Sequence, residues 1–279
     1  MSDTLVESSA ESAFLDLHKK HSQQGALAEL QQTALNRFES LGFPHSKHEM
    51  FTFVNTKGLV ETSFNLPDDS GRVSEDFIAG NIYPGCEHQC LVFVDGVFNG
   101  GLSRIDGVSA SLMPLSEAMS DQQLKDYLSE TAENENDAFA SLSTAFCSEG
   151  LVFKVDDNTQ ISGTVQVLFV STDRDAGPVM HAPRLIWQLG KLSEVKVIEK
   201  FVGTEGGYFI NSVQDWLLAE GAGVSLTQIQ ADPFDSWHFS KTRIHLDRNS
   251  RFYSSNASSG TQLARHHYEV RLKEEGSEL

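Results

Sequence analysis

Four short segments in the second half of the chain decide the fold: Trp187-Gln188-Leu189, Trp216-Leu217-Leu218, Ile244-His245-Leu246 and Val270-Arg271-Leu272. Their leucines are 29, 28 and 26 residues apart, and a small or polar turn follows each one. In the first three copies an apolar residue stands six positions after the leucine, at Val195, Val224 and Phe252. This half of the chain therefore contains a weak repeat.

A fixed period of this length in strand-rich sequence is typical of stacked coils, because one coil cannot bury its inward face alone. We predict a β-helix in which Leu189, Leu218 and Leu246 lie in register inside one hydrophobic interior. The alternative that the period leaves open is an antiparallel sandwich with evenly spaced hairpins. The fourth copy stops just past its turn, and we expect an uncapped coil of this kind to expose strand edges and self-associate.

The character of the sequence changes at Gly150. Beyond it, short runs of β-branched and aromatic residues dominate, as at 165–170 and 224–229, and no helical period is visible. The sequence predicts a mainly β protein with two domains. A helix-rich α+β domain spans residues 1–148, and an incomplete β-helix spans residues 149–279.

The first domain has helical stripes separated by turns. Leu27, Leu30, Ala34 and Phe38 fall at helical spacing before Gly42, which predicts a helix with a left-handed stop. A short helix is expected around 14–18, and another is expected to contain the stripe at 139, 142 and 146.

Two local motifs in this domain predict how its elements begin or turn. Ser120 with Gln123 forms a capping-box pattern at the start of a helix. The strand 91–94 runs into Asp95-Gly96, a pair that favours a tight hairpin.

Composition excludes several classes of function. The formal net charge of −18 disfavours binding to nucleic acids and anionic membranes. No apolar run approaches the roughly 20 residues that span a bilayer, and no secretory signal precedes the first domain. Three cysteines do not form a disulfide framework, so we expect a cytoplasmic protein.

Enzyme motifs are missing from the sequence. It contains no P-loop, no nucleophile elbow and no dinucleotide fingerprint, so we predict no catalytic residues and no enzymatic activity of its own. A carbohydrate-active β-helix enzyme is an alternative, but it would need carboxylates along one strand face. Asp232, Asp235 and Asp247 instead read as turn residues.

The compact set of soft ligands is Cys86, His88 and Cys90, which could bind zinc or iron in an independent metal-binding protein. The spacing matches no standard zinc knuckle, and an incidental loop is the simpler interpretation. Cys147 is expected to pack as a small hydrophobe at a helix end.

Histidines are frequent late in the chain, at 238, 245, 266 and 267. Alternate strand positions face the same side, so His266 and His267 point opposite ways, as do His238 and His245 in an unbroken strand. Packed or solvent-facing histidines are the simpler interpretation, and a transient iron site is the alternative.

Several segments resemble the SufD branch of the SufB/SufD family. The segment 41–53 contains the family's Pro44, Lys47 and Glu49, with Phe51 and Phe53 where Trp and Tyr are usual. The strand 91–96, the segment 197–203 and the turn before Arg265 also fit, although Ser259-Gly260 stands where the family has paired glycines. The similarity runs from about residue 40 to the end.

The resemblance implies a right-handed parallel β-helix after a helical N-terminal domain. It also implies a scaffold for iron–sulfur cluster assembly that works with a SufB-like subunit and a SufC-like ATPase. Family members are longer, so the chain is expected to be C-terminally truncated and to lack the helices that dock SufC.

The family's known cluster-assembly residues lie beyond the region of this chain, so none is carried over. We therefore expect no cofactor bound by this chain, with a transient iron–sulfur cluster or iron only in the full complex. Pro44, Lys47, Glu49 and Arg265 are candidate contact residues, and a purely local structural role is the alternative for them.

Overall fold

The computed structural model describes residues 2–20, 25–44, 48–68, 73–172, 177–204 and 207–279. Within these residues the chain forms a helical layer and two sheets of seven strands each. The helices are α1 (Ser2–Lys20), α2 (Ala28–Leu41), η1 (Glu49–Phe51), α3 (Lys57–Val60), α4 (Glu75–Asn81), α5 (Leu115–Ala118), α6 (Gln122–Asn134) and α7 (Ala138–Phe146).

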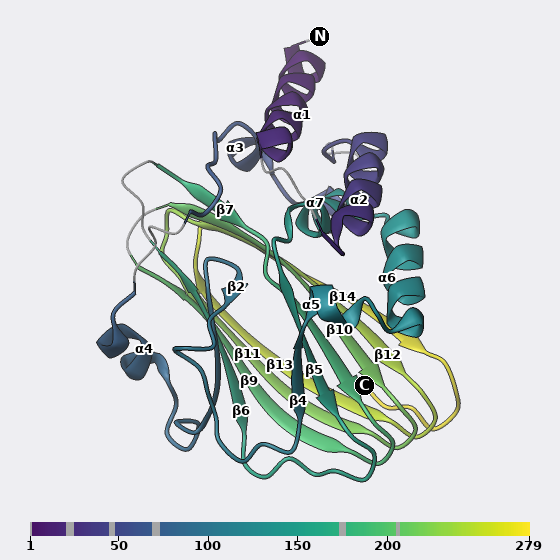
Figure 1. Ribbon diagram of the computed structural model, residues 1–279. Coiled ribbons are helices and arrows are strands. Elements are labelled where there is room, and N and C mark those ends of the chain that lie inside the picture. The colour runs from purple at the N-terminus through teal and green to yellow at the C-terminus, as the bar shows by residue number, and fades with distance from the viewer. Residues whose placement is uncertain (1, 21–24, 45–47, 69–72, 173–176, 205–206) are drawn as a thin grey trace.

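The second half of the chain winds as a solenoid (Figure 1). The first sheet, called sheet A, contains β4 (Ser111–Pro114), β5 (Gly150–Val155), β7 (Val179–His181), β8 (Arg184–Leu189), β10 (Tyr208–Leu218), β12 (Trp237–Leu246) and β14 (Leu263–Leu272). The second, sheet B, contains β1 (Gln89–Val94), β2 (Val97–Phe98), β3 (Arg104–Ile105), β6 (Val165–Ser171), β9 (Glu194–Gly203), β11 (Gly223–Asp232) and β13 (Arg251–Gly260). From β8 to β14, successive strands alternate between the two sheets, and each pairs in parallel with the strand two places on.

The predicted register is confirmed. Leu218 pairs with Leu189 on β8 and with Leu246 on β12, and all three belong to one buried cluster inside the solenoid. Trp187 and Trp216 stack on adjacent coils, with ring centroids 4.5 Å apart. Parallel pairing throughout the repeats rules out the antiparallel sandwich, because hairpins would have produced antiparallel neighbours.

Each coil turns at the same place after its in-register residue. Asn158, Leu192, Gly221 and Asn249 all stand three residues beyond that position, and all adopt a positive φ between 54° and 71°. Glycine and asparagine tolerate this left-handed conformation, whereas a leucine is strained in it. Three of the four turn residues therefore suit the backbone geometry, and Leu192 is the exception.

The helical layer packs on the outer face of sheet A. α2 packs against α6 and α7, and α7 contacts β10 and β12 (Figure 1). The shared core includes Phe38, Phe139 and Phe239. On the other side, α4 covers the outer face of sheet B through Ile78 and Val92.

Most local predictions for the first domain are confirmed. α2 ends at Gly42, whose φ is 64° and whose N–H donates to Phe38 O at 2.9 Å. The hairpin turn forms at Asp95 and Gly96, which both have positive φ. Phe14 lies in a helix as expected, but α1 is far longer than the short helix predicted there.

The predicted capping box is wrong. α6 begins one residue later than the pattern requires, and the Asp121 side chain accepts from the N–H groups of Gln123 and Leu124. Ser120 instead donates its hydroxyl to Glu117 O at 2.8 Å. An aspartate next to the serine offers a charged acceptor for the same helix end, which serine cannot match.

Strands from both sides of the predicted boundary at 148/149 join the solenoid sheets. β1 pairs in parallel with β6, and β4 pairs with β5. None of the described helices is long and apolar enough to cross a bilayer.

Candidate functional site

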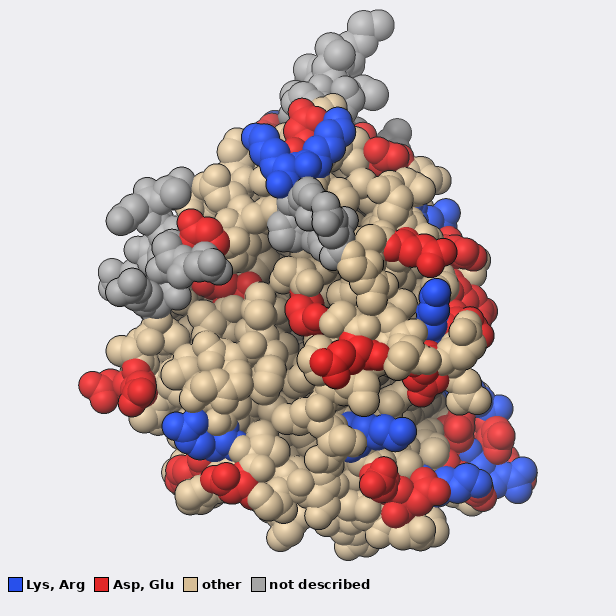
Figure 2. All heavy atoms as spheres, in the orientation of Figure 1, with Lys and Arg blue, Asp and Glu red and all other residues tan. Residues whose placement is uncertain are grey.

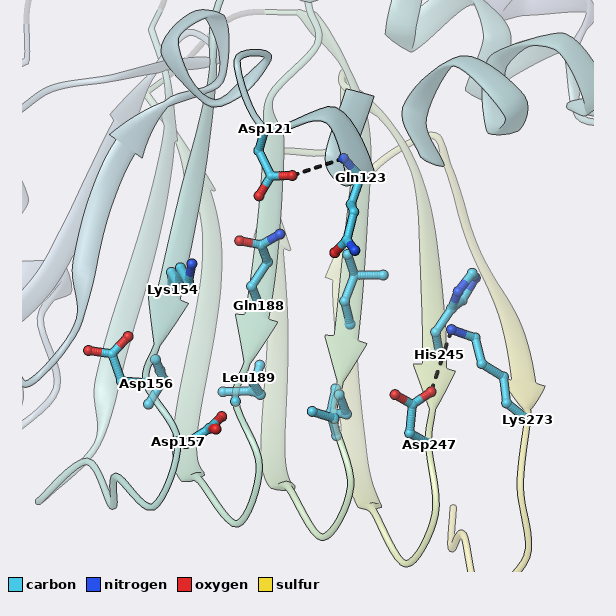
Figure 3. A pocket seen from close by; sticks show the side chains of 15 residues that line it. Asp121, Gln123, Lys154, Asp156, Asp157, Gln188, Leu189, His245, Asp247 and Lys273 are labelled. Atoms are coloured by element: carbon cyan, nitrogen blue, oxygen red, sulfur yellow. Dashed lines mark hydrogen bonds and ion pairs between the residues drawn. The ribbon is translucent and has the colours of Figure 1, made fainter. Parts of the chain in front are cut away.

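A groove of about 640 Å³ crosses the outer face of sheet A at the carboxyl ends of its strands (Figure 3). Its floor contains Lys154, Gln188, Leu217 and His245, which stand side by side on four neighbouring strands. The N-terminus of α6 lies over the floor and contributes Asp121. The groove therefore forms where the helical layer meets the solenoid.

Aspartates line this groove. Asp121 caps α6, and Asp157 accepts a hydrogen bond of 2.7 Å from the backbone N–H of Lys191. Asp247 pairs with Lys273 at 3.5 Å, and Asp156 stands exposed at the opposite end. Three of the four carboxylates thus have structural partners, which does not favour the free acid–base pair that a carbohydrate-active enzyme needs.

His245 is the buried polar group of the groove. Its side chain lies against the Tyr127 ring, 5.2 Å between centroids, and its Nε2 has no hydrogen-bond partner among the described residues. Burial, followed by the charges of Lys273 and Arg271, lowers its pKa to about 4. The imidazole is therefore neutral at physiological pH, and its Nε2 is buried.

Next to the groove, a buried ion network joins the helical layer to sheet A. Glu135, at the end of α6, pairs with Arg243 and with Lys241 Nζ at 2.6 Å, and all three side chains are 3% exposed. Asp215 pairs with Arg243 at 3.2 Å and with Arg184, and it also accepts from the Tyr127 hydroxyl at 2.6 Å.

The cations of this network keep its carboxylates charged. Burial alone would raise the pKa of Glu135, but Arg243 and Lys241 together lower it below its ordinary value. The pKa of Asp215 is lowered in the same way, since Arg184 and Arg243 outweigh its burial. Buried charges are tolerated only when paired, so this network fixes how α6 sits on the solenoid.

A second polar cluster lies inside the solenoid. Asp232 accepts from Gln230 and contacts His238 Nδ1, each at 2.8 Å. The prediction that Asp232 is a turn residue is wrong, because it is the last residue of β11 and faces inward. Burial alone would raise its pKa, but His238 and the hydrogen-bond donors together lower it.

Glu199 stands in the same interior and is fully buried. Its Oε2 accepts from Gln214 and Gln228 at 3.0 and 3.1 Å, and burial outweighs these bonds and raises its pKa to about 7. This carboxyl is therefore partly protonated at neutral pH.

The late histidines separate as predicted. His266 contacts Ser240 Oγ at 2.7 Å inside the solenoid, whereas His267 lies 3.1 Å from Asp137 on the outer face. His238 faces inward and His245 outward. Across the part of the chain that the structure describes, no three histidine, cysteine, aspartate or glutamate side chains gather closely enough to hold a metal ion.

The predicted soft-ligand set divides between interior and surface. Cys86 and Cys90 are buried, whereas His88 is exposed and lies 3.3 Å from Asp106. Burial, with a smaller effect of Cys86, raises the pKa of the Cys90 thiol to about 12. Metal ligation needs the thiolate, so this environment works against it. Cys147 is buried at the end of α7, as expected.

The candidate contact residues take different places. Arg265 stacks over the Phe51 ring at 4.3 Å and pairs with Asp137 at 2.7 Å, so it serves the helix–solenoid junction. Glu49 is exposed and Pro44 is half-buried. Lys47 lies outside the described residues.

Sequence reasoning did not find the ion network. Its signal was present on β12, where Lys241, Arg243 and His245 alternate at every second position. Such alternation places all three side chains on one strand face, and only the fold reveals that helices cover that face.

Two family models match consecutive parts of the chain. The SufBD protein N-terminal region matches residues 10–167, and the SufBD core domain of the SUF system for FeS cluster assembly matches residues 169–279. The chain belongs to the SufBD family. The family expectation is confirmed at this level, and so is the parallel β-helix after a helical region.

A curated SufBD relative extends the comparison. The iron–sulfur cluster assembly SufBD family protein slr0076 of Synechocystis sp. is 28% identical over 270 residues. The alignment covers 91% of this chain and 58% of that protein's length. This chain therefore spans less than two thirds of that relative's length, and its placement in the SufD branch stays a prediction.

Proposed function

We propose that this chain acts as a SufD-like scaffold subunit of a cytoplasmic SufBCD-type complex, beside a SufB-like subunit and a SufC-like ATPase. The observation that carries the proposal is the pair of consecutive family matches, which together extend from residue 10 to the end of the chain. The buried ion network supports it, because it holds the helical layer and solenoid together as a defined platform.

The chemistry of the chain fits a scaffold. Its sequence has no P-loop to bind ATP, so a partner supplies the energy of assembly. Iron and sulfide are the substrates of the complex, and the cluster is its cargo for transfer to apo-proteins. This chain contributes a rigid surface on which the other subunits assemble.

Co-purification tests the proposal. The chain, with an affinity tag, is co-expressed with the SufB-like and SufC-like proteins of the same organism, and both are expected to co-elute with it in fixed ratio. A tag placed on an unrelated protein of similar charge is the control. Recovery of the tagged chain alone would overturn the proposal.

Reconstitution separates scaffolding from simple contact. Complexes with and without this chain are supplied with iron, sulfide and ATP, and cluster formation is followed by visible absorption. We expect faster formation or transfer when the chain is present. Equal rates in both preparations would contradict a role in assembly.

A further inference from the structure

We propose that Glu199 and Gln214 share one proton inside the solenoid as an acid–amide pair, and that the loss of this proton is transmitted to the exposed Asn256. This pH-sensitive device is built into the fold and goes beyond the assembly role proposed above. Its basis is a buried carboxyl without a cation, two buried oxygen atoms without a donor, and a row of amide hydrogen bonds that leads to the surface.

Glu199 is buried without a positively charged partner. Figure 2 shows acidic side chains spread over the face in view, where water solvates them, whereas Glu199 is 0% exposed. The buried carboxylates of Glu135 and Asp215 keep their charge because basic side chains pair with them. Within the described residues no such cation pairs with Glu199, and its burial raises its pKa to about 7. An unpaired buried charge is costly, which favours the neutral, protonated carboxyl.

Further titratable side chains face the interior from the surrounding strands, at positions that alternate with outward residues: Tyr208, Asp232, His238, His266 and Tyr268. Asp232 bonds to the Tyr208 hydroxyl and to His238, and His266 bonds to the hydroxyls of Ser240 and Ser258. Burial raises the pKa of Tyr268, and the charge of Glu199 adds to this effect. The shift at Glu199 itself comes from burial, opposed by hydrogen bonds from two glutamines.

Two oxygen atoms of the acid–amide pair lack a donor. Gln214 Nε2 donates to Glu199 Oε2 at 3.0 Å, which joins the amide to the carboxyl. The other oxygen of each group, Glu199 Oε1 and Gln214 Oε1, is buried and has no hydrogen-bond partner among the described residues. Two acceptors cannot bond to each other, but a protonated Glu199 Oε1 is a donor for Gln214 Oε1. The pair then forms a ring of two hydrogen bonds, and the cost of two unsatisfied buried oxygens is removed.

A row of amide hydrogen bonds leads from Glu199 to the surface. Gln228 Nε2 donates to Glu199 Oε2 at 3.1 Å. Gln228 Oε1 in turn accepts from Asn256 Nδ2 at 2.7 Å and from the Tyr268 hydroxyl at 3.2 Å. Each donor thus points toward the carboxyl, and hydrogen bonds arranged in such a row polarise one another. Because Asn256 is exposed on β13, the charge of a fully buried carboxyl changes a hydrogen bond at the surface.

The device changes state near neutral pH. As the pH rises, the O–H bond of the Glu199 carboxyl breaks, its electron pair stays on the oxygen and the proton leaves to solvent. The hydrogen bond to Gln214 Oε1 is lost, whereas the bond from Gln228 becomes charge-assisted and therefore stronger. The protonated form dominates below about pH 7 and the ionised form above it.

NMR spectroscopy of the full chain tests both parts of the proposal. The protein carries carbon-13 in the glutamate side-chain carboxyls and nitrogen-15 in the asparagine side-chain amides, and spectra are recorded between about pH 5 and pH 9. The variants Glu199→Gln and Asn256→Ser assign the two signals, because each variant loses one of them. We expect the Glu199 signal to titrate with a midpoint of about 7, and the Asn256 signal to shift with the same midpoint.

Variants separate the proton from its transmission. Glu199→Gln keeps the shape of the side chain without its ionisation, so the Asn256 signal is expected to lose its pH dependence. Glu194→Gln is the matched control, since Glu194 is exposed on the same strand, and both titrations are expected to stay unchanged. Gln228→Leu is expected to leave Glu199 titrating while the Asn256 signal no longer follows. A Glu199 midpoint below about pH 5, as in an ordinary glutamate, or an Asn256 signal that ignores Glu199 or still follows it in Gln228→Leu, would overturn the proposal.

Discussion

Replacing Glu135 with glutamine removes the carboxylate that Lys241 and Arg243 share, and leaves Lys241 with Glu269 and Arg243 with Asp215 as their remaining partners. All three side chains are 3% exposed, so water cannot replace the lost charge. Removing one partner of a buried ion pair costs about 3–5 kcal/mol. The backbone N–H groups of Asn136 and Asp137 each donate to Glu135 Oε1 at 2.9 Å, and the side-chain oxygen of glutamine can still accept these hydrogen bonds. We therefore expect a loss of about 3 kcal/mol in the free energy of unfolding.

Urea denaturation followed by tryptophan fluorescence measures this loss, because Trp187 and Trp216 are fully buried. Glu133→Gln is the matched control, since Glu133 is exposed on the same helix and such a change costs less than about 0.5 kcal/mol. The pKa of Glu135 is lowered in the folded protein. Its contribution is thus present above its ordinary pKa and is lost as the pH falls through the lowered value.

The difference between wild type and Glu135→Gln is therefore expected at pH 7 and is expected to shrink towards pH 3. A loss below about 1 kcal/mol at pH 7, or a loss equal to that of Glu133→Gln, would refute the idea that this network fixes the helical layer. A difference that grows on acidification would refute the assigned sign.

Three further outcomes are expected. Glu199→Gln is expected to stabilise the protein at pH 8 by up to about 3 kcal/mol and to have little effect below pH 4.5. The reason is that the pKa of Glu199 is raised to about 7, so the folded protein loses stability as the pH rises through that value. Denaturation at several pH values checks this, and a difference that stays constant with pH would contradict it. Gly260→Ala is expected to lower the melting temperature by several degrees, because the φ of Gly260 is +80° and the new Cβ would overlap the Asp232 carbonyl. Gly58→Ala is the control, since Gly58 has open space around it, and equal changes in melting temperature for the two variants would contradict this reasoning. The buried cysteines are expected to react with a thiol reagent only after unfolding; rapid labelling of the native protein, or protection of it by zinc, would instead support the metal-binding hypothesis for Cys86 and Cys90.

The apolar residues that line the interior of the solenoid were predictable from the sequence, because they recur at a nearly fixed spacing along the chain. Leu189, Leu218 and Leu246 align since every coil must place its apolar residues on the same inward row. The hairpin at Asp95 and the helix stop at Gly42 were predictable for a related reason, because positive φ restricts residue choice within a few positions.

The sites were much less predictable. Nothing in the local sequence shows that Glu135 reaches Arg243, over a hundred residues away, or that Asp156 and Asp247 bracket one groove. Asp232 looked like a turn residue because turns favour aspartate, and only the pairing of β11 with its neighbours shows that it faces the interior.

The sequence by itself determined the repeat and its register, because these depend on periodic burial and on local backbone geometry, and its motifs carried the resemblance to the family. Parallel pairing in the structure decided between the solenoid and the antiparallel sandwich. Tertiary structure alone decided which outward side chains became buried under the helices and which remained open in the groove. The physical reason is that strand alternation fixes the face on which Lys241 or His245 stands, whereas the protein or water that covers this face depends on how α6 and α7 pack against the solenoid.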